Sequence, residues 1–216
     1  MTGRRTAARK KKGAYHHGDL EQALVDTALK TIRRDGVQGL TLRGVGAELG
    51  VSRTALYRHF EDKAALVSRV ALEGFRLFHD ALSGALERAA KNGGEPLEEM
   101  GRAYVRFALQ NPSHYQTMFG GYLTDWEKYP DLASRAQDTF MLLVDTVRDE
   151  QRQDKIVSGD PVELAEILWS LSHGIATLGA AGQLDRTGTA IEELALTGCR
   201  ALRRGLQRPA AAPRRR

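Results

Sequence analysis

Cysteine is almost absent from this 216-residue chain, which contains only Cys199. A single cysteine excludes an intrachain disulfide and also a zinc site built on several cysteines. One thiol, together with the lack of a secretory apolar segment near the N-terminus, favours a reducing cytoplasm as the location. The chain also lacks internal repeats and any run with the sustained alternation of a β-strand.

No motif in the sequence has the spacing of a catalytic site. The chain contains no G-x-S-x-G, no Walker loop and no H-E-x-x-H. Ser172 and His173 are neighbours on a predicted helix and therefore cannot face each other. Cys199 lies in an apolar stripe, which favours a packed, unreactive thiol. We therefore expect a protein that is not an enzyme and that carries no cofactor and no metal.

Charge is distributed unevenly along the chain, although the formal net charge is only +5. Residues 1–60 contain twelve Lys and Arg against five Asp and Glu, and residues 200–216 contain seven Arg and no acid. Between them, residues 61–199 contain thirteen basic and twenty-two acidic side chains. Because basic ends attract polyanions, they indicate nucleic acid or an anionic membrane surface as the partner.

Apolar residues recur at helical spacing through most of the chain. Asp19 is a plausible cap of the first helix, and Gly36 is expected to end it. The periodicity indicates an all-α fold of about nine helices. The segments that carry it are 20–35, 42–49, 53–60, 63–92, 96–110, a short aromatic segment at 115–122, 132–151, 161–181 and 189–206.

Two of the short segments are joined by the turn Leu49-Gly50-Val51-Ser52. Gly suits the left-handed position of such a turn, and Ser52 caps the helix that follows. A helix, a three- or four-residue turn containing Gly and a second helix form the helix-turn-helix pattern. In DNA-binding proteins the second helix of this pattern lies in the major groove.

The residues around this turn resemble the TetR/AcrR family of transcriptional regulators. The resemblance rests on Thr41-Leu42-Arg43, on Gly50-Val51-Ser52 and on the run Leu56-Tyr57-Arg58-His59-Phe60-Glu61-Asp62-Lys63. Two further stretches, 15–20 and 168–174, resemble the branch of the family that has a Trp…His-Gly motif, here Trp169 with His173-Gly174. The chain departs from the family pattern at Gly44, Gly46 and Thr54.

The resemblance implies a homodimer with a helix-turn-helix DNA-binding domain at 15–63 and a helical ligand-binding and dimerisation domain at 64–207. Residues 1–14 and 208–216 are expected to form a disordered basic arm and tail. A repressor of this kind releases double-stranded operator DNA when a small, mostly apolar effector binds. The expected contacts between subunits come from the last two helices and are Leu171, Ile175, Ala195, Cys199, Leu202 and Leu206.

Candidate site residues fall into two groups. Arginine can bond guanine bidentately and Thr can contact a thymine methyl group, so Arg53 and Thr54 are expected to read bases. The predicted DNA-binding residues are Thr41, Arg43, Ser52, Arg53, Thr54, Tyr57, Arg58, His59 and Lys63. The predicted effector-binding residues are Phe78, Tyr104, Phe107, Met118, Phe119, Tyr122, Trp126, Trp169 and His173.

Three alternatives stay open at this point. The chain also fits an all-α scaffolding protein whose basic ends touch a membrane or nucleic acid without sequence preference. The uncharged stretch 167–184 is long enough for a membrane span, but its polar and glycine residues favour a buried or subunit-interface helix. His79, His114 and His173 could share a metal, but they lie on separate predicted helices without local ligand spacing.

Overall fold

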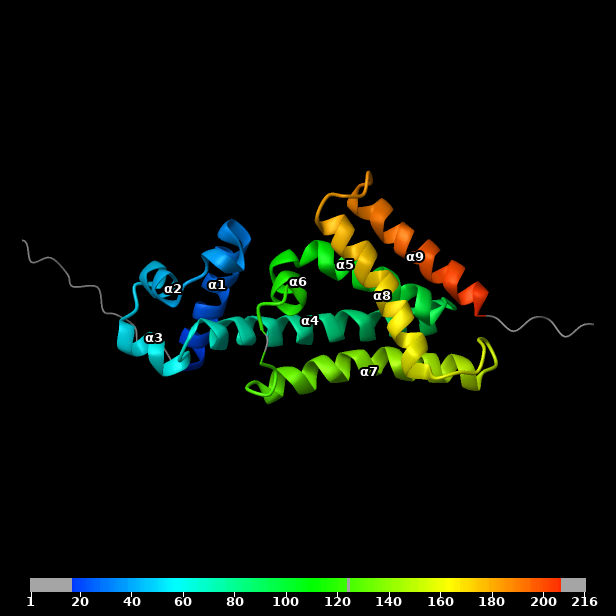
Figure 1. The fold of residues 1–216 in the computed structure, drawn as a ribbon, viewed down its shortest axis with the longest axis horizontal. Helices are drawn as coiled ribbons and strands as arrows, with labels where there is room; N and C mark the ends of the chain where they lie inside the picture. Colours follow the sequence, from blue (N-terminus) through cyan, green and yellow to red (C-terminus); the bar gives the residue numbers. More distant parts are fainter. Residues whose placement is uncertain (1–16, 124, 207–216) are drawn as a thin grey trace, which may run out of the picture.

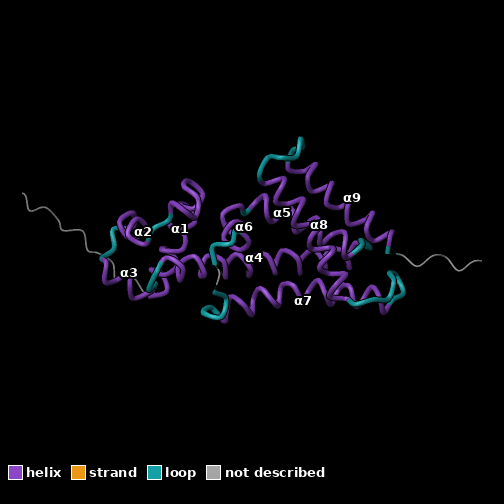
Figure 2. The backbone as a smooth tube through the Cα atoms, viewed as in Figure 1, coloured by secondary structure: helices purple, strands orange, loops and turns teal. Residues whose placement is uncertain are grey.

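The computed structural model describes residues 17–123 and 125–206, and within them all regular secondary structure is helical (Figures 1 and 2). The basic arm and tail lie outside the described residues. The helices are α1 His17–Gly39, α2 Leu42–Leu49, α3 Arg53–His59, α4 Lys63–Asn92, α5 Pro96–Gln110, α6 Pro112–Phe119, α7 Pro130–Arg152, α8 Pro161–Ala180 and α9 Gly188–Gly205. The predicted all-α fold is confirmed.

The first helix differs from its prediction at both ends. It begins at His17, so Asp19 lies inside the first turn and is not its cap. Gly36 adopts a φ of 70° and a non-helical ψ, after which one further turn leads to Gly39. The glycine therefore interrupts α1 where the sequence placed its end, because only a residue without Cβ takes this left-handed conformation readily.

The turn between α2 and α3 has the geometry that its sequence predicts. The Thr41 hydroxyl accepts the Gly44 N–H at 3.0 Å, and the Ser52 hydroxyl accepts the Ala55 N–H at 3.2 Å. Gly50, with a φ of 65°, closes α2 in the left-handed conformation. These caps satisfy N–H groups that each helix start leaves without a partner, and so they fix where α3 begins.

Helix α4 connects the two ends of the molecule (Figure 1). Its 30 residues span about 45 Å, from the end of the helix-turn-helix to the far side of the bundle. It packs on α1, α5, α6 and α7. One hydrophobic core runs without a break from Leu24 of α1 through α4 to Ile191 of α9. A displacement of α4 would therefore move residues both in the helix-turn-helix unit and in the bundle.

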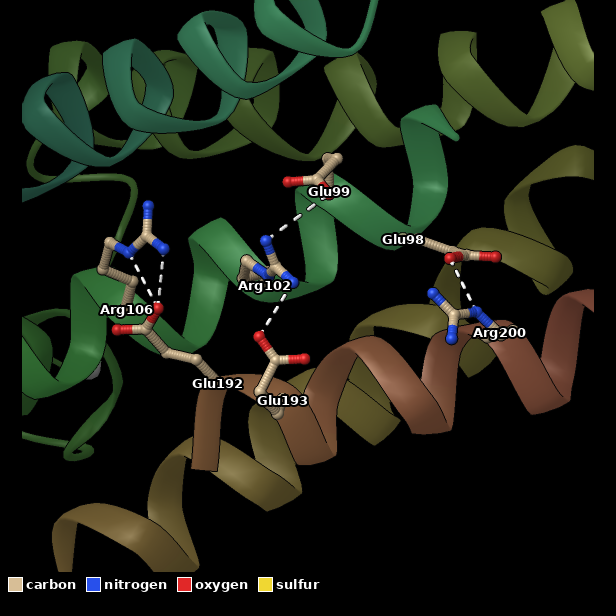
Figure 3. Close-up of polar contacts among 7 residues, drawn as sticks. All are labelled: Glu98, Glu99, Arg102, Arg106, Glu192, Glu193 and Arg200. Carbon is tan, nitrogen blue, oxygen red and sulfur yellow. Dashed lines mark hydrogen bonds and ion pairs between the residues drawn. The ribbon is translucent and has the colours of Figure 1, made fainter. Parts of the chain in front are cut away.

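Helix α9 lies along α5 and is tied to it by ion pairs (Figure 3). Arg106 donates two hydrogen bonds to Glu192, and Arg102 donates one to Glu193. Further along, Arg200 donates to Glu98 at 3.1 Å. The arginines of this row are partly exposed, and ion pairs of this kind contribute about 1 kcal/mol each, so the row sets the register of α9 more than it adds stability.

A buried charge cluster closes the far end of the bundle. Arg203 of α9 reaches Glu150 of α7 at 3.2 Å and Glu95, just before α5, at 2.8 Å. Lys155 adds a contact to Glu150, which is 2% exposed. Removing one partner from such a cluster leaves a buried charge uncompensated, so these side chains lock the ends of three helices together.

The uncharged stretch 167–184 lies in α8 and the turn after it. No helix within the described residues combines the length and apolar character that a bilayer span requires. One face of α8 packs on α5, α7 and α9, while Ile167 and Leu178 on its other face are 45% and 43% exposed. The helix is therefore only half buried in a single subunit.

Asp62 caps α4 at the junction between α3 and the long helix. Its carboxylate accepts the Ala65 N–H at 2.7 Å and the Lys128 ammonium at 3.2 Å. These bonds, led by the one from the Ala65 backbone, lower the pKa of Asp62 below its ordinary value of 3.8. The ionised form is thus the one that the fold stabilises.

We expect Asp62→Ala to lower the free energy of unfolding by about 1 kcal/mol at neutral pH, since a helix cap is lost. A carboxylate with a lowered pKa stabilises the fold above pH 3.8 and loses that effect as the pH falls through its folded value. The difference between the two proteins in urea unfolding should therefore shrink in acid. Asp80→Ala, which removes only surface contacts with Arg76 and His79 and no helix cap, is the control.

Candidate DNA-binding surface and effector cavity

Helix α3 presents a basic face to solvent. Its exposed side chains are Arg53, Thr54, Tyr57 and Arg58. The Arg53 guanidinium lies 5.4 Å from the centroid of the Tyr57 ring, which holds it over the aromatic face. Leu56 on the opposite side is 2% exposed and packs against α2 near Gly46. The burial of Leu56 orients α3 so that its cationic side chains face outward.

The other predicted DNA contacts lie around this helix. Arg43 is exposed on α2, and His59 is partly buried at the end of α3. The hydroxyl oxygens of Thr41 and Ser52 accept hydrogen bonds from backbone N–H groups. The O–H hydrogen of each side chain remains available to donate to a phosphate. Lys63 donates to the Gln38 carbonyl at 3.2 Å and thereby also ties the start of α4 to the end of α1.

A cavity of about 230 Å³ lies inside the bundle formed by α4 to α9. Six of the nine predicted effector-binding residues line it: Phe78, Tyr104, Met118, Phe119, Trp126 and Trp169. Lining residues outside these nine are Phe75, Leu82, Leu97, Met100, Gly101, Ala136, Thr139, Phe140, Leu143, Leu168, Ser172 and Cys199. Most are apolar residues at ordinary helical spacing, which gives no signal that separates a cavity wall from a packed core.

Three predicted residues lie elsewhere. Phe107 packs behind Phe78, with ring centroids 4.9 Å apart, and does not line the cavity. Tyr122 packs against the core beside Gly120. His173 lies on the other side of Tyr104 and lines a second cleft, which α1, α6 and α8 form. Helical spacing correctly places Trp169 and His173 on one face of α8. Only the fold shows that Trp169 lines the cavity whereas His173 lines the second cleft.

The cavity contains polar groups but no charged side chain. The Ser172 hydroxyl donates to the Leu168 carbonyl at 3.0 Å, and the Thr139 hydroxyl donates to the Arg135 carbonyl at 2.8 Å. Both hydroxyls thus bond to their own helices. A molecule in this space meets aromatic and aliphatic side chains, as small-molecule sites require, with few polar groups to orient it.

Tyr104 is the main polar group of the wall. Its hydroxyl accepts the Trp169 indole N–H at 3.2 Å and lies 2.9 Å from His173 Nδ1. Burial raises the pKa of Tyr104 well above its ordinary value and lowers the pKa of His173. The phenol and the neutral imidazole are therefore the forms that this environment favours at neutral pH.

Cys199 lies at the floor of the cavity, where α9 crosses α5. A Cβ added at Gly101 would overlap its sulfur, so the two helices approach closely there. Burial raises the pKa of the Cys199 thiol, which keeps it protonated. Cys199 and Ala195, both at most 1% exposed, therefore pack inside the subunit and do not face a partner as the sequence analysis expected.

Metal-binding side chains do not gather in the described part of the chain. No group of three or more His, Cys, Asp or Glu there has a geometry that could hold an ion. His79 lies beside Ser83 and Asp80 on α4, whereas His114 of α6 packs against Gly74 of α4. The three histidines considered above thus have separate surroundings.

An N-terminal helix-turn-helix unit with an exposed basic second helix, followed by a helical bundle, defines the molecule as a DNA-binding regulator of the helix-turn-helix class. Residues 24–70 match the model of the family described as bacterial regulatory proteins, tetR family, and residues 97–202 match that of the tetracyclin repressor-like C-terminal domain. The chain belongs to the TetR family of bacterial transcriptional regulators. It is a regulator of transcription and not an enzyme.

Relatives and solved structures agree with this assignment. The uncharacterised HTH-type regulator YobS of Bacillus subtilis is 23% identical over 83% of this chain and 89% of its own length. The uncharacterised HTH-type regulator Rv0472c of Mycobacterium tuberculosis is 32% identical, but the match covers only 52% of this chain and 47% of that protein.

Among solved structures, a protein of unknown function from Rhodococcus sp. RHA1 matches with a TM-score of 0.78. It is 32% identical, and the match covers 91% of this chain and all of that one. The TetR-family regulator PfmR from Thermus thermophilus has a TM-score of 0.67 at 21% identity, covering 86% and 99%. At that identity, the second likeness concerns the fold alone.

We expect Arg53→Ala and Thr54→Ala each to weaken binding to the preferred DNA sequence by about 1–3 kcal/mol, because each removes a predicted base contact. The preferred sequence comes from selection of genomic fragments by the purified wild-type protein, and affinities from gel shift. Arg88→Ala, an exposed charge loss on the far part of α4, is the control. Equal losses on selected and random DNA would falsify base reading by Arg53 and Thr54.

Proposed function

We propose that the protein is a ligand-responsive repressor, which binds operator DNA through α3 and releases it when a small molecule fills the cavity. The observation that carries this proposal is the cavity of about 230 Å³, whose wall includes α4, the helix that also begins beside α3. Residues 15–63 and 64–207 would be the DNA-binding and effector-binding domains, in keeping with the matched ranges 24–70 and 97–202.

The coupling would run through α4 and α6. Three α4 residues, Phe75, Phe78 and Leu82, line the cavity. Helix α6 crosses α4 at Gly74, where an added Cβ would stand 2.7 Å from Met118 Sδ, and it also touches α1. An effector that displaces Met118 and Phe119 would therefore move α6, and because α6 is closely packed on α4, it would move α4 as well. By linkage, operator DNA weakens effector binding by the same factor.

The chemistry of the wall favours an uncharged, mostly apolar effector. No Lys, Arg, Asp, Glu or His lines the cavity, and burying an unpaired charge there would cost several kcal/mol. The phenol of Tyr104, the thiol of Cys199 and the hydroxyl oxygens of Ser172 and Thr139, which can still accept, are the groups available for hydrogen bonds to an effector. A free carboxylate or ammonium would have no counter-charge in this space.

Homodimerisation is supported by the half-buried state of α8. Ile167 and Leu178 lie exposed on its outward face, and Leu171, one turn from Ile167, packs against Gly198 of α9 at the edge of that face. Burying this apolar face against its copy would make a four-helix contact and set the two recognition helices about 34–36 Å apart, one turn of DNA. With DNA as its partner, such a protein would act in the cytoplasm.

We expect Ala136→Leu to block induction, because the added side chain occupies cavity space in the wall of α7. An apolar compound that releases wild-type protein from its selected DNA should lose that effect on the variant, while DNA affinity without the compound stays unchanged. Gln137→Leu adds a similar bulk at the exposed neighbouring position and is the matched control. Retained induction in Ala136→Leu would place the effector elsewhere.

We expect Ile167→Glu to shift the protein from dimer to monomer at micromolar concentration, since a buried carboxylate would face an apolar partner surface. Sedimentation velocity of the variant and of Gln137→Glu, an exposed control on α7, measures the change. The same variant should bind a two-half-site operator weakly. A dimer that survives Ile167→Glu and Leu178→Glu together would move the interface to another face.

A further inference from the structure

A second cleft, of about 470 Å³, lies between α1, α6 and α8. One wall consists of Ile32 and Arg33 from α1, a helix within the segment that matches the N-terminal family model. The other walls come from α6 and α8, which lie in the segment matching the C-terminal model. An occupant of this cleft therefore touches both functional parts of the chain at once.

The cleft combines a positive charge with hydrogen-bonding groups and apolar walls. Arg33 is exposed and has no hydrogen-bond or ion-pair partner among the described residues. Gln116 and His173 each contribute nitrogen atoms, and Thr177 a hydroxyl. The apolar part of the lining is Ile32, Pro112, Phe119, Ala180 and Ala181. No acidic side chain lines the cleft, so its field favours an anion.

A hydrogen-bonded partition separates the cleft from the apolar cavity. His173 Nδ1 lies 2.9 Å from the hydroxyls of both Tyr104 and Tyr115, and Tyr115 also reaches the Thr177 hydroxyl at 3.2 Å. These bonds use Nδ1 alone, so Nε2 of His173 has no partner in the part of the chain described. Phe119 lines both spaces.

We propose that this cleft is a second ligand site, which takes a small organic carboxylate with an apolar body. The guanidinium of Arg33 matches the two oxygens of a carboxylate, and Thr177 and His173 Nε2 are further donors on the opposite wall. The apolar body packs on Phe119 and Ile32. This site goes beyond the proposed effector cavity, whose uncharged lining rejects the same ligand.

A bound carboxylate bridges α1 to α8 across a space that packing leaves open. Such a bridge fixes the orientation of α1, and with it that of α2 and α3, relative to the bundle. Binding of the carboxylate and of DNA must then be coupled, with equal factors in both directions. The site thus gives the protein a second input, distinct in charge from that of the apolar cavity.

The probe for this site is 4-fluorobenzoate, observed by fluorine NMR on the full-length protein, with uncharged 4-fluorobenzamide as its analogue. We expect saturable binding of the acid at millimolar concentration, at least tenfold weaker for the amide. Arg33→Ala should weaken binding of the acid about tenfold. Arg34→Ala removes the same charge from the next position, where Arg34 pairs with Asp35, and should change nothing.

Two further variants place the ligand. Ala180→Phe, on the exposed rim of the cleft, should abolish binding of 4-fluorobenzoate, while Ala136→Leu, in the apolar cavity, should leave it unchanged. The proposal is overturned by equal effects of Arg33→Ala and Arg34→Ala, by loss of binding in Ala136→Leu, or by no saturable binding at all. None of these outcomes bears on DNA binding by α3, whereas loss of binding in Ala136→Leu would place the acid in the apolar cavity.

Discussion

Burial of the apolar face of α4 is the constraint on which the rest of the structure depends. Leu66, Val67 and Val70 at its start pack in the same core as α1, whereas Phe75, Phe78 and Leu82 further along form the wall of the cavity. One rigid element thus belongs to both ends of the molecule. Because interiors are close-packed, the proposed coupling between the cavity and the helix-turn-helix unit would run along this helix.

The polar groups around the cavity are bonded within the protein. Tyr104 accepts from Trp169 and bonds to His173, and these bonds hold its hydroxyl in the cavity wall. Ser172 and Thr139 bond to their own helices. An apolar space of this kind leaves dispersion contacts unmade, and an apolar guest recovers them. The row of ion pairs from α5 to α9 holds the floor of the cavity in place.

The binding surfaces and cavities of the molecule differ in charge, and these differences determine which kind of partner each one suits. The outward face of α3 is cationic, the cavity is uncharged, and the cleft beside α1 has Arg33 as its charged group. The outward face of α8 is apolar around Ile167 and Leu178. These four environments suit DNA, a neutral apolar molecule, an organic anion and a second subunit respectively, since each partner requires a different balance of charge and apolar area.

The sequence by itself determined the helices, the turn between α2 and α3 and the family, because caps, glycines and apolar periodicity act over a few residues. Gly50 and Ser52 do in the structure what their local pattern predicts. Only the tertiary structure decided which aromatic residues surround a cavity: Phe107 and Phe78 have the same helical signal, yet one lies behind the other. It also decided that His173 faces the cleft and that Cys199 packs against Gly101. Such facts depend on how helices far apart in the chain cross, and no spacing within one helix encodes that.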